Sequence, residues 1–142
     1  MQRKIIAALG LMAATALLSP VSVRAENIAE GKRIYAESCA ACHGTNLEGQ
    51  PNWQQVTETG EYPAPPHDRT GHTWHHSDKV LIDYVTLGGA ELLKSQGINN
   101  FKSGMPAFGE ILTEQNILDV LAYIKSTWPP REQQVQKSRS NQ

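Results

Sequence analysis

One pentapeptide, Cys39-Ala40-Ala41-Cys42-His43, constrains this sequence more than any other feature. Its cysteines are the only two in the chain, so no second pair is available for a disulfide framework. The two thiols are three residues apart at the end of a predicted helix and therefore face the same way. The histidine that follows can reach a group held on that side. The pattern indicates that something other than a disulfide network engages this pair.

This spacing is typical of covalent haem attachment. Two thiols on one side can add to the two vinyl groups of one haem, and the adjacent imidazole is a strong axial ligand for its iron. A dithiol redox pair is the first alternative, but it normally follows a strand in an α/β domain, and the chain shows no such pattern. A structural zinc site is the second, and it needs further ligands such as His67, His72, His75 or His76.

The first 25 residues predict a secretory signal peptide. Arg3 and Lys4 form a positive n-region, residues 5–18 are almost wholly apolar, and a small-residue cleavage pattern ends at Ala25. The apolar stretch is shorter than the roughly 20 residues that span a bilayer, so an uncleaved anchor is the weaker hypothesis. Cleavage would leave ten basic and 14 acidic residues, a net charge of −4, because Arg3, Lys4 and Arg24 leave and no acid does. We expect an exported, periplasmic protein without stable membrane insertion after cleavage and without a basic surface for nucleic acid.

Residues 26–130 are predicted to form one helical domain. Asn27 caps a helix that ends near residue 38, and Ser77 or Asp78 caps a shorter one that ends at Gly88. Residues 44–77 lack a sustained period and are predicted to wrap a large prosthetic group. Thr113 begins the clearest helix, which ends near residue 128 and has an apolar stripe of Ile117, Val120, Leu121 and Ile124. No repeat and no convincing strand is visible, and residues 131–142, with one apolar residue in twelve, are predicted to be a disordered tail.

The chain resembles the class I c-type cytochromes. The resemblance rests on Gly31 and Tyr35 in the first helix, the attachment motif, Gly104-Met105-Pro106, and Val120-Leu121-Ala122-Tyr123 in the last helix. It implies an all-α cytochrome c fold, with three to five helices around one covalent haem, in which the first and last helices cross almost perpendicularly at the glycine and the aromatic residue. It also implies haem c as the cofactor.

Met105 is the candidate for the second axial ligand. It is the only methionine outside the signal peptide, because Met1 and Met12 both lie within it. A thioether favours ferrous iron, so a His43 and Met105 pair would raise the reduction potential relative to two histidines. The alternative is a gap-filling methionine in the core, but a position between Gly104 and Pro106 in a loop favours the ligand.

The resemblance also implies two contacts around the haem. The axial histidine of the family donates its second N–H to a proline carbonyl in the loop after the motif, which here points to Pro65 or Pro66, with Pro51 as a weaker candidate. We choose Pro66. A loop tryptophan of the family contacts a haem propionate, and Trp74 is the expected counterpart, with Trp53 as the alternative.

Residues 67–78 contain four histidines and two aspartates and depart from the simplest members of that family. One hypothesis is a solvated loop packed over the haem edge, with its histidines bonded to propionates or backbone. A second is an accessory copper or zinc site. A third is a ligand swap in which one of these histidines displaces Met105.

The predicted function is that of a periplasmic electron carrier with one covalent haem c and His/Met ligation. Because both axial positions are filled, no turnover at the iron is expected, so the chain is predicted not to be an enzyme. Its expected partners are redox proteins, which it would meet either as a free carrier or as a subunit of a larger oxidoreductase. The alternatives are a copper-handling redox protein that uses His67 to His76, and a haem-based sensor or enzyme with a displaceable Met105.

Overall fold

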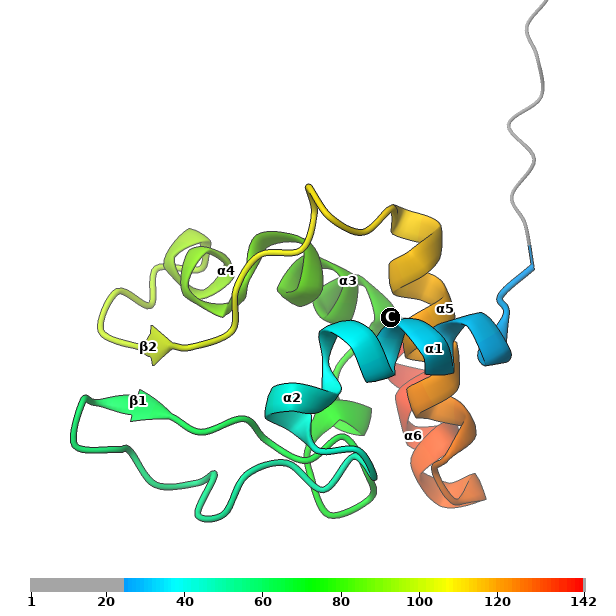
Figure 1. The fold of residues 1–142 in the computed structure, drawn as a ribbon, viewed down its shortest axis with the longest axis horizontal. Helices are drawn as coiled ribbons and strands as arrows, with labels where there is room; N and C mark the ends of the chain where they lie inside the picture. The colour runs from blue at the N-terminus through cyan, green and yellow to red at the C-terminus, as the bar shows by residue number, and fades with distance from the viewer. Residues whose placement is uncertain (1–24, 142) are drawn as a thin grey trace, which may run out of the picture.

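The computed structural model describes residues 25–141. Residues 1–24 of the predicted signal peptide lie outside the described residues. The chain forms, in order, α1 (Ile28–Ser38), α2 (Ala40–His43), β1 (Glu61–Tyr62), the 3-10 helix η1 (Thr73–His75), α3 (Asp78–Leu87), α4 (Gly89–Ser95), β2 (Lys102–Ser103), α5 (Glu114–Ser126) and α6 (Pro130–Ser140) (Figure 1). The all-α prediction is confirmed, since the two strands are only two residues long. Within residues 25–141, no helix combines the length and the apolar character needed to cross a membrane.

The frame of the domain is the crossing of α1 and α5, which run in clearly different directions in Figure 1. Gly31 lies at this crossing, where a Cβ would overlap the carbonyl oxygen of Asp119. Asp119 also accepts a hydrogen bond of 2.7 Å at Oδ1 from the backbone N–H of Asn27, just before α1 begins. The missing side chain at Gly31 therefore lets two backbones touch, as the resemblance implied.

Two hydrophobic clusters pack around this crossing. Tyr35 and Ile34 of α1 meet the buried side of α5, and Leu47, from the loop after α2, joins them. The first cluster contains Ile34, Tyr35, Leu47, Val120, Ile124 and Trp128. The second contains Leu81, Ile117 and Leu121, and so attaches α3 to α5. All four residues predicted as the apolar stripe of the last helix are buried in these clusters.

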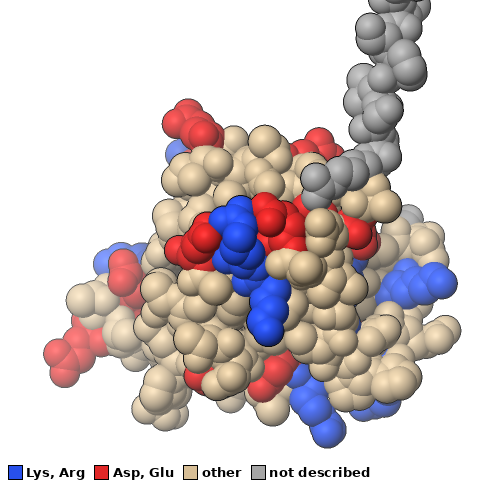
Figure 2. Space-filling view, turned by 45° about the vertical axis from the view of Figure 1, so that its right-hand side comes forward, with Lys and Arg blue, Asp and Glu red and all other residues tan. Residues whose placement is uncertain are grey.

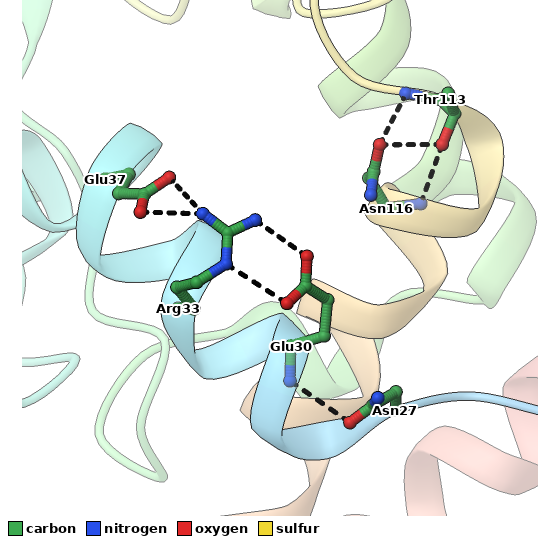
Figure 3. A network of polar contacts seen from close by, with 6 residues as sticks. All are labelled: Asn27, Glu30, Arg33, Glu37, Thr113 and Asn116. Carbon is green, nitrogen blue, oxygen red and sulfur yellow. Dashed lines mark hydrogen bonds and ion pairs between the residues drawn. The ribbon is translucent and has the colours of Figure 1, made fainter.

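The first turn of α5 is held by a capping box, which confirms Thr113 as its N-cap. The Thr113 hydroxyl accepts from the backbone N–H of Asn116 at 3.2 Å, and the Asn116 side chain accepts from the backbone N–H of Thr113 at 3.1 Å (Figure 3). Each bond satisfies a backbone donor that the helix itself leaves free.

The predicted disordered tail is wrong for residues 131–140, which belong to the helix α6, Pro130–Ser140. This helix brings the described part of the chain to six α-helices, one above the expected range. Pro130 occupies the first turn, where the missing N–H of proline has no cost, and most of the residues that follow are good helix formers. Glu132 and Gln136 are its buried residues, so polar side chains rather than an apolar stripe face the domain.

Candidate haem site

The cysteine and histidine side chains of the motif come from one helical turn. Cys39 is the residue between α1 and α2, and its carbonyl accepts from the backbone N–H of Cys42 at 3.1 Å and of His43 at 2.9 Å. Both cysteines are free thiols, Cys39 half-buried and Cys42 exposed. One turn therefore presents two thiols and one imidazole together, as the spacing predicted.

The His43 ring is buried and held in one orientation. Its Nδ1 lies 2.8 Å from the carbonyl oxygen of Pro65. Because a carbonyl only accepts, Nδ1 carries the proton and donates, which leaves Nε2 as the nitrogen that can bind a metal. Burial lowers the pKa of His43 despite the opposing effect of this hydrogen bond, so the ring is neutral at pH 7, the form that iron requires.

The choice of Pro66 as the acceptor is wrong. The carbonyl oxygen of Pro66 instead accepts from the Thr73 hydroxyl at 3.5 Å and lies against Gly71, where a Cβ would overlap it. Adjacent prolines each offer one carbonyl, and the course of the surrounding loop decides which of them meets the histidine.

Backbone contacts hold this loop beneath α2. The N–H of Gly49 donates to the carbonyl of His43 at 2.7 Å, and the N–H of His67 donates to the carbonyl of Leu47 at 2.8 Å. Gly49 has a φ of +68°, and a Cβ there would lie 2.5 Å from the nitrogen of Pro66. A glycine is required because the backbone at Gly49 passes this close to the backbone at Pro66.

Met105 lies in the connection between β2 and α5, against the junction of α3 and α4. Its carbonyl accepts from the N–H of Gly89 at 3.2 Å, and its N–H donates to the Ser103 hydroxyl at 3.2 Å. Gly88, with a φ of +78°, ends α3 where a Cβ would lie 2.8 Å from the nitrogen of Ala107. Met105 is half-buried and belongs to neither hydrophobic cluster of residues 25–141, which does not favour the gap-filling alternative.

Comparison with known proteins agrees with the haem site that this geometry indicates. The family model of cytochrome c matches residues 28–128. The chain belongs to the cytochrome c family. It is 29% identical to cytochrome c6 of Synechococcus sp. over 119 residues, which cover 84% of this chain and 86% of that protein. It is 31% identical to the cbb3-type cytochrome c oxidase subunit CcoP of Azospirillum brasilense over 96 residues, 67% of this chain but only 26% of that subunit. No solved structure matches it at a significant level.

Cytochromes c carry covalent haem c and transfer electrons, so haem c is the cofactor of this chain. The side chains present fit that group, because the turn supplies two free thiols and a neutral imidazole with Nε2 available. The dithiol alternative is not supported. Burial, followed by the nearby Cys42, raises the pKa of Cys39 to about 11, whereas a dithiol redox pair needs a thiol whose pKa is lowered.

The sequence offered His67 as a candidate metal ligand, but the structure gives it a different place in this cytochrome's site, beside His43. Its ring stacks on that of His43, with centroids 4.0 Å apart and planes 22° apart. Its Nδ1 lies 2.8 Å from the Thr73 hydroxyl, and its carbonyl accepts from Trp128 Nε1 at 2.7 Å. Burial, followed by the neighbouring histidines, holds the pKa of His67 well below its ordinary value. In the sequence, only the position of His67 two residues after Pro65 could have indicated that its ring lies on that of His43.

The other histidines of residues 67–78 do not join His67 in a metal site. His72 stacks on Trp53 with ring centroids 5.3 Å apart and meets His76 edge to face at 5.4 Å, while His75 packs against Trp74. Within residues 25–141, no three His, Cys, Asp or Glu side chains come together in a way that could hold a metal ion. The geometry of the described residues therefore does not support the copper or zinc hypothesis.

Trp74 sits half-buried at the edge of the first hydrophobic cluster. Its Nε1 donates to the carbonyl of Arg69 at 3.3 Å, a long hydrogen bond near the surface. Trp53 is occupied by its stack with His72. The contact of Trp74 with a haem propionate stays a prediction.

Proposed function

We propose that this cytochrome c is a one-electron carrier whose single haem c has His43 and Met105 as axial ligands. The observation that carries the proposal is the hydrogen bond from His43 Nδ1 to Pro65 in the turn that holds Cys39 and Cys42. It fixes the tautomer and the orientation of the ring before any metal is present. A ligand fixed in this way changes little between oxidation states, as electron transfer requires.

Four side chains have distinct roles in the proposal. Cys39 and Cys42 would hold the haem through thioethers, and His43 would bind the iron through Nε2. Met105 would supply sulfur from the connection between β2 and α5, which is supported by its place outside the hydrophobic clusters and by the two hydrogen bonds that fix its backbone. When bound, haem c provides reversible exchange between ferric and ferrous iron.

We also propose that the protein works outside the cytoplasm as a carrier and not as an enzyme. The signal-like pattern of residues 1–25 supports export, and two filled axial positions would leave no site for substrate on the iron. On the face shown in Figure 2, basic and acidic side chains are interspersed, without a large patch of one sign. The partners are redox proteins, and the likeness to part of an oxidase subunit suggests an oxidase among them.

The test is a pyridine haemochrome spectrum together with the intact mass of the protein after export in a host with haem-attachment machinery. We expect one haem c per chain, a mass increased by one haem, and a ferric near-infrared charge-transfer band between sulfur and iron. Colourless protein with the mass of the polypeptide alone would contradict covalent attachment. Rapid carbon monoxide binding by the reduced protein would contradict stable Met105 ligation.

Met105→Ala tests the sulfur ligand separately. The haem should stay attached, because the thioethers are untouched, while the near-infrared band disappears and the reduction potential falls. Ile111→Ala is the matched control, since Ile111 lies in the same connection and its side chain is 72% exposed. An unchanged potential in Met105→Ala would identify another ligand.

A further inference from the structure

Two loops that are far apart in sequence are joined at one end of the molecule. β1 pairs with β2 in parallel, with Glu61 opposite Lys102 and Tyr62 opposite Ser103, and Figure 1 shows the two strands side by side. The rings of Tyr62 and Phe101 stack beside this pair, with centroids 5.0 Å apart and planes only 4° apart. We name the two strands and these two rings the clasp.

Each half of the clasp lies close in sequence to one of the two axial sides of the proposed haem site. Tyr62 is three residues before Pro65, whose carbonyl fixes His43. Phe101 is four residues before Met105, and Ser103 of β2 accepts from the N–H of Met105 at 3.2 Å. Only a few residues therefore separate the clasp from Met105 and from the carbonyl that fixes His43.

The clasp does not belong to the core of the domain. Tyr62 is 40% exposed, Phe101 is half-buried, and neither belongs to the hydrophobic clusters found in residues 25–141. One further hydrogen bond joins the same two loops: Lys102 Nζ donates to the carbonyl of Thr59 at 3.2 Å. Local opening of such a peripheral contact needs far less free energy than global unfolding.

We propose that Tyr62 and Phe101 are positioning residues for Met105: the clasp ties the methionine loop to the loop that holds His43 and keeps the sulfur on the iron. This inference rests on the proposed function. An iron–thioether bond is weak, so its occupancy depends on how long the loop stays closed. A stacked aromatic pair changes the closing equilibrium by a factor of up to about ten.

The test compares Tyr62→Ala, Phe101→Ala and the double variant of the haem-loaded protein. In each, the near-infrared sulfur-to-iron band should be lost at lower temperature than in the wild type, and carbon monoxide should bind the reduced protein about three to ten times faster. The double variant should lie close to the single ones, because both remove the same contact. Tyr62→Phe keeps the stack and should restore wild-type behaviour.

Val56→Ala is the matched control, since Val56 precedes β1 in the same loop and is 56% exposed. It should leave the band and the rate of carbon monoxide binding unchanged. Haem-protein unfolding followed by circular dichroism completes the experiment. If the band were lost only together with the helices, the clasp would be a general stabiliser and the proposal would be overturned.

The failures of the two proposals are distinguishable. A wild-type protein without the sulfur-to-iron band would overturn Met105 ligation and the positioning role with it. A wild-type protein that has the band, with alanine variants that match it in band stability and in carbon monoxide binding, would overturn the clasp alone.

Discussion

The first and the last helix of this cytochrome are held to the same domain in different ways. α1 is held by shape, since Gly31 brings its backbone against that of Asp119 and Tyr35 fills the core beside it. α6 is held by polar side chains, since Gln136 Nε2 donates to Asp78 Oδ1 at 2.7 Å and the Ser140 hydroxyl accepts from the backbone N–H of Asp78 at 3.0 Å. Lys125 of α5 donates to the same Asp78 oxygen at 2.9 Å.

The difference determines what each interface tolerates. Two helices whose backbones touch can no longer pack so closely when a single carbon atom is added between them, but this packing does not depend on pH. A network of hydrogen bonds tolerates small changes in side-chain shape, but its stability depends on every partner and on the charge of Asp78. The predictions below test this contrast, beginning with the largest effect.

Gly31→Ala should destabilise the protein by about 2 kcal/mol, although alanine is the better helix former. Helix propensity alone would stabilise α1 by about 1 kcal/mol, while the overlap with the carbonyl of Asp119 costs about 3 kcal/mol. Denaturant unfolding of the haem protein measures the difference. Gly104→Ala is the control, since nothing lies within 4 Å of its added Cβ. A stabilised Gly31→Ala protein would show that the two helices can separate at no cost.

Gln136→Ala should release α6 at a cost of about 1 to 2 kcal/mol, because it leaves buried polar partners without their donor. Gln136 is only 4% exposed, and it also donates to the carbonyl of His76 at 3.4 Å. Hydrogen exchange should accelerate in α6 and in η1, but not at the crossing of α1 and α5. Gln134→Ala, at an exposed position of the same helix, is the control. Unchanged exchange in α6 would show that its polar contacts are dispensable.

The attachment of α6 should weaken on acidification. Burial alone would raise the pKa of Asp78, but the hydrogen bond and the charge of Lys125, together with Gln136 and Ser140, outweigh it and hold this pKa below its ordinary value. The stabilisation is therefore complete above the ordinary aspartate pKa, about 3.9, and is lost as the pH falls through the lowered value. Hydrogen exchange in α6 as a function of pH measures this loss. Asp78→Asn should exchange faster at neutral pH and show little of the dependence, and a wild type equally protected at pH 2 would contradict the prediction.

The same contrast explains which parts could be predicted from the sequence. The cap at Thr113, the apolar stripe of α5 and the attachment motif depend on residues within a few positions of one another, so periodicity and spacing predict them. α6 could not be found in this way, because its partner Asp78 lies 58 residues from Gln136 in the chain and is polar. The choice of Pro65 over Pro66 and the stack of His67 on His43 depend on the course of a long loop, which has no periodic pattern.

Arg33 offers the smallest effect, because its ion pairs with Glu30 and Glu37 both lie along one exposed side of α1. Its guanidinium contacts Glu30 at 2.7 Å and Glu37 at 2.6 Å along the outer side of α1 (Figure 3), with its side chain 54% exposed. The hydrogen bonds to the two glutamates, followed by their charges, raise the pKa of Arg33, but water and salt screen exposed pairs, so little stability depends on them. Arg33→Ala should unfold at nearly the wild-type denaturant concentration, with any difference disappearing in high salt. If it destabilised the protein as much as Gln136→Ala, local and long-range polar networks would be equivalent here, and the contrast between α1 and α6 would fail.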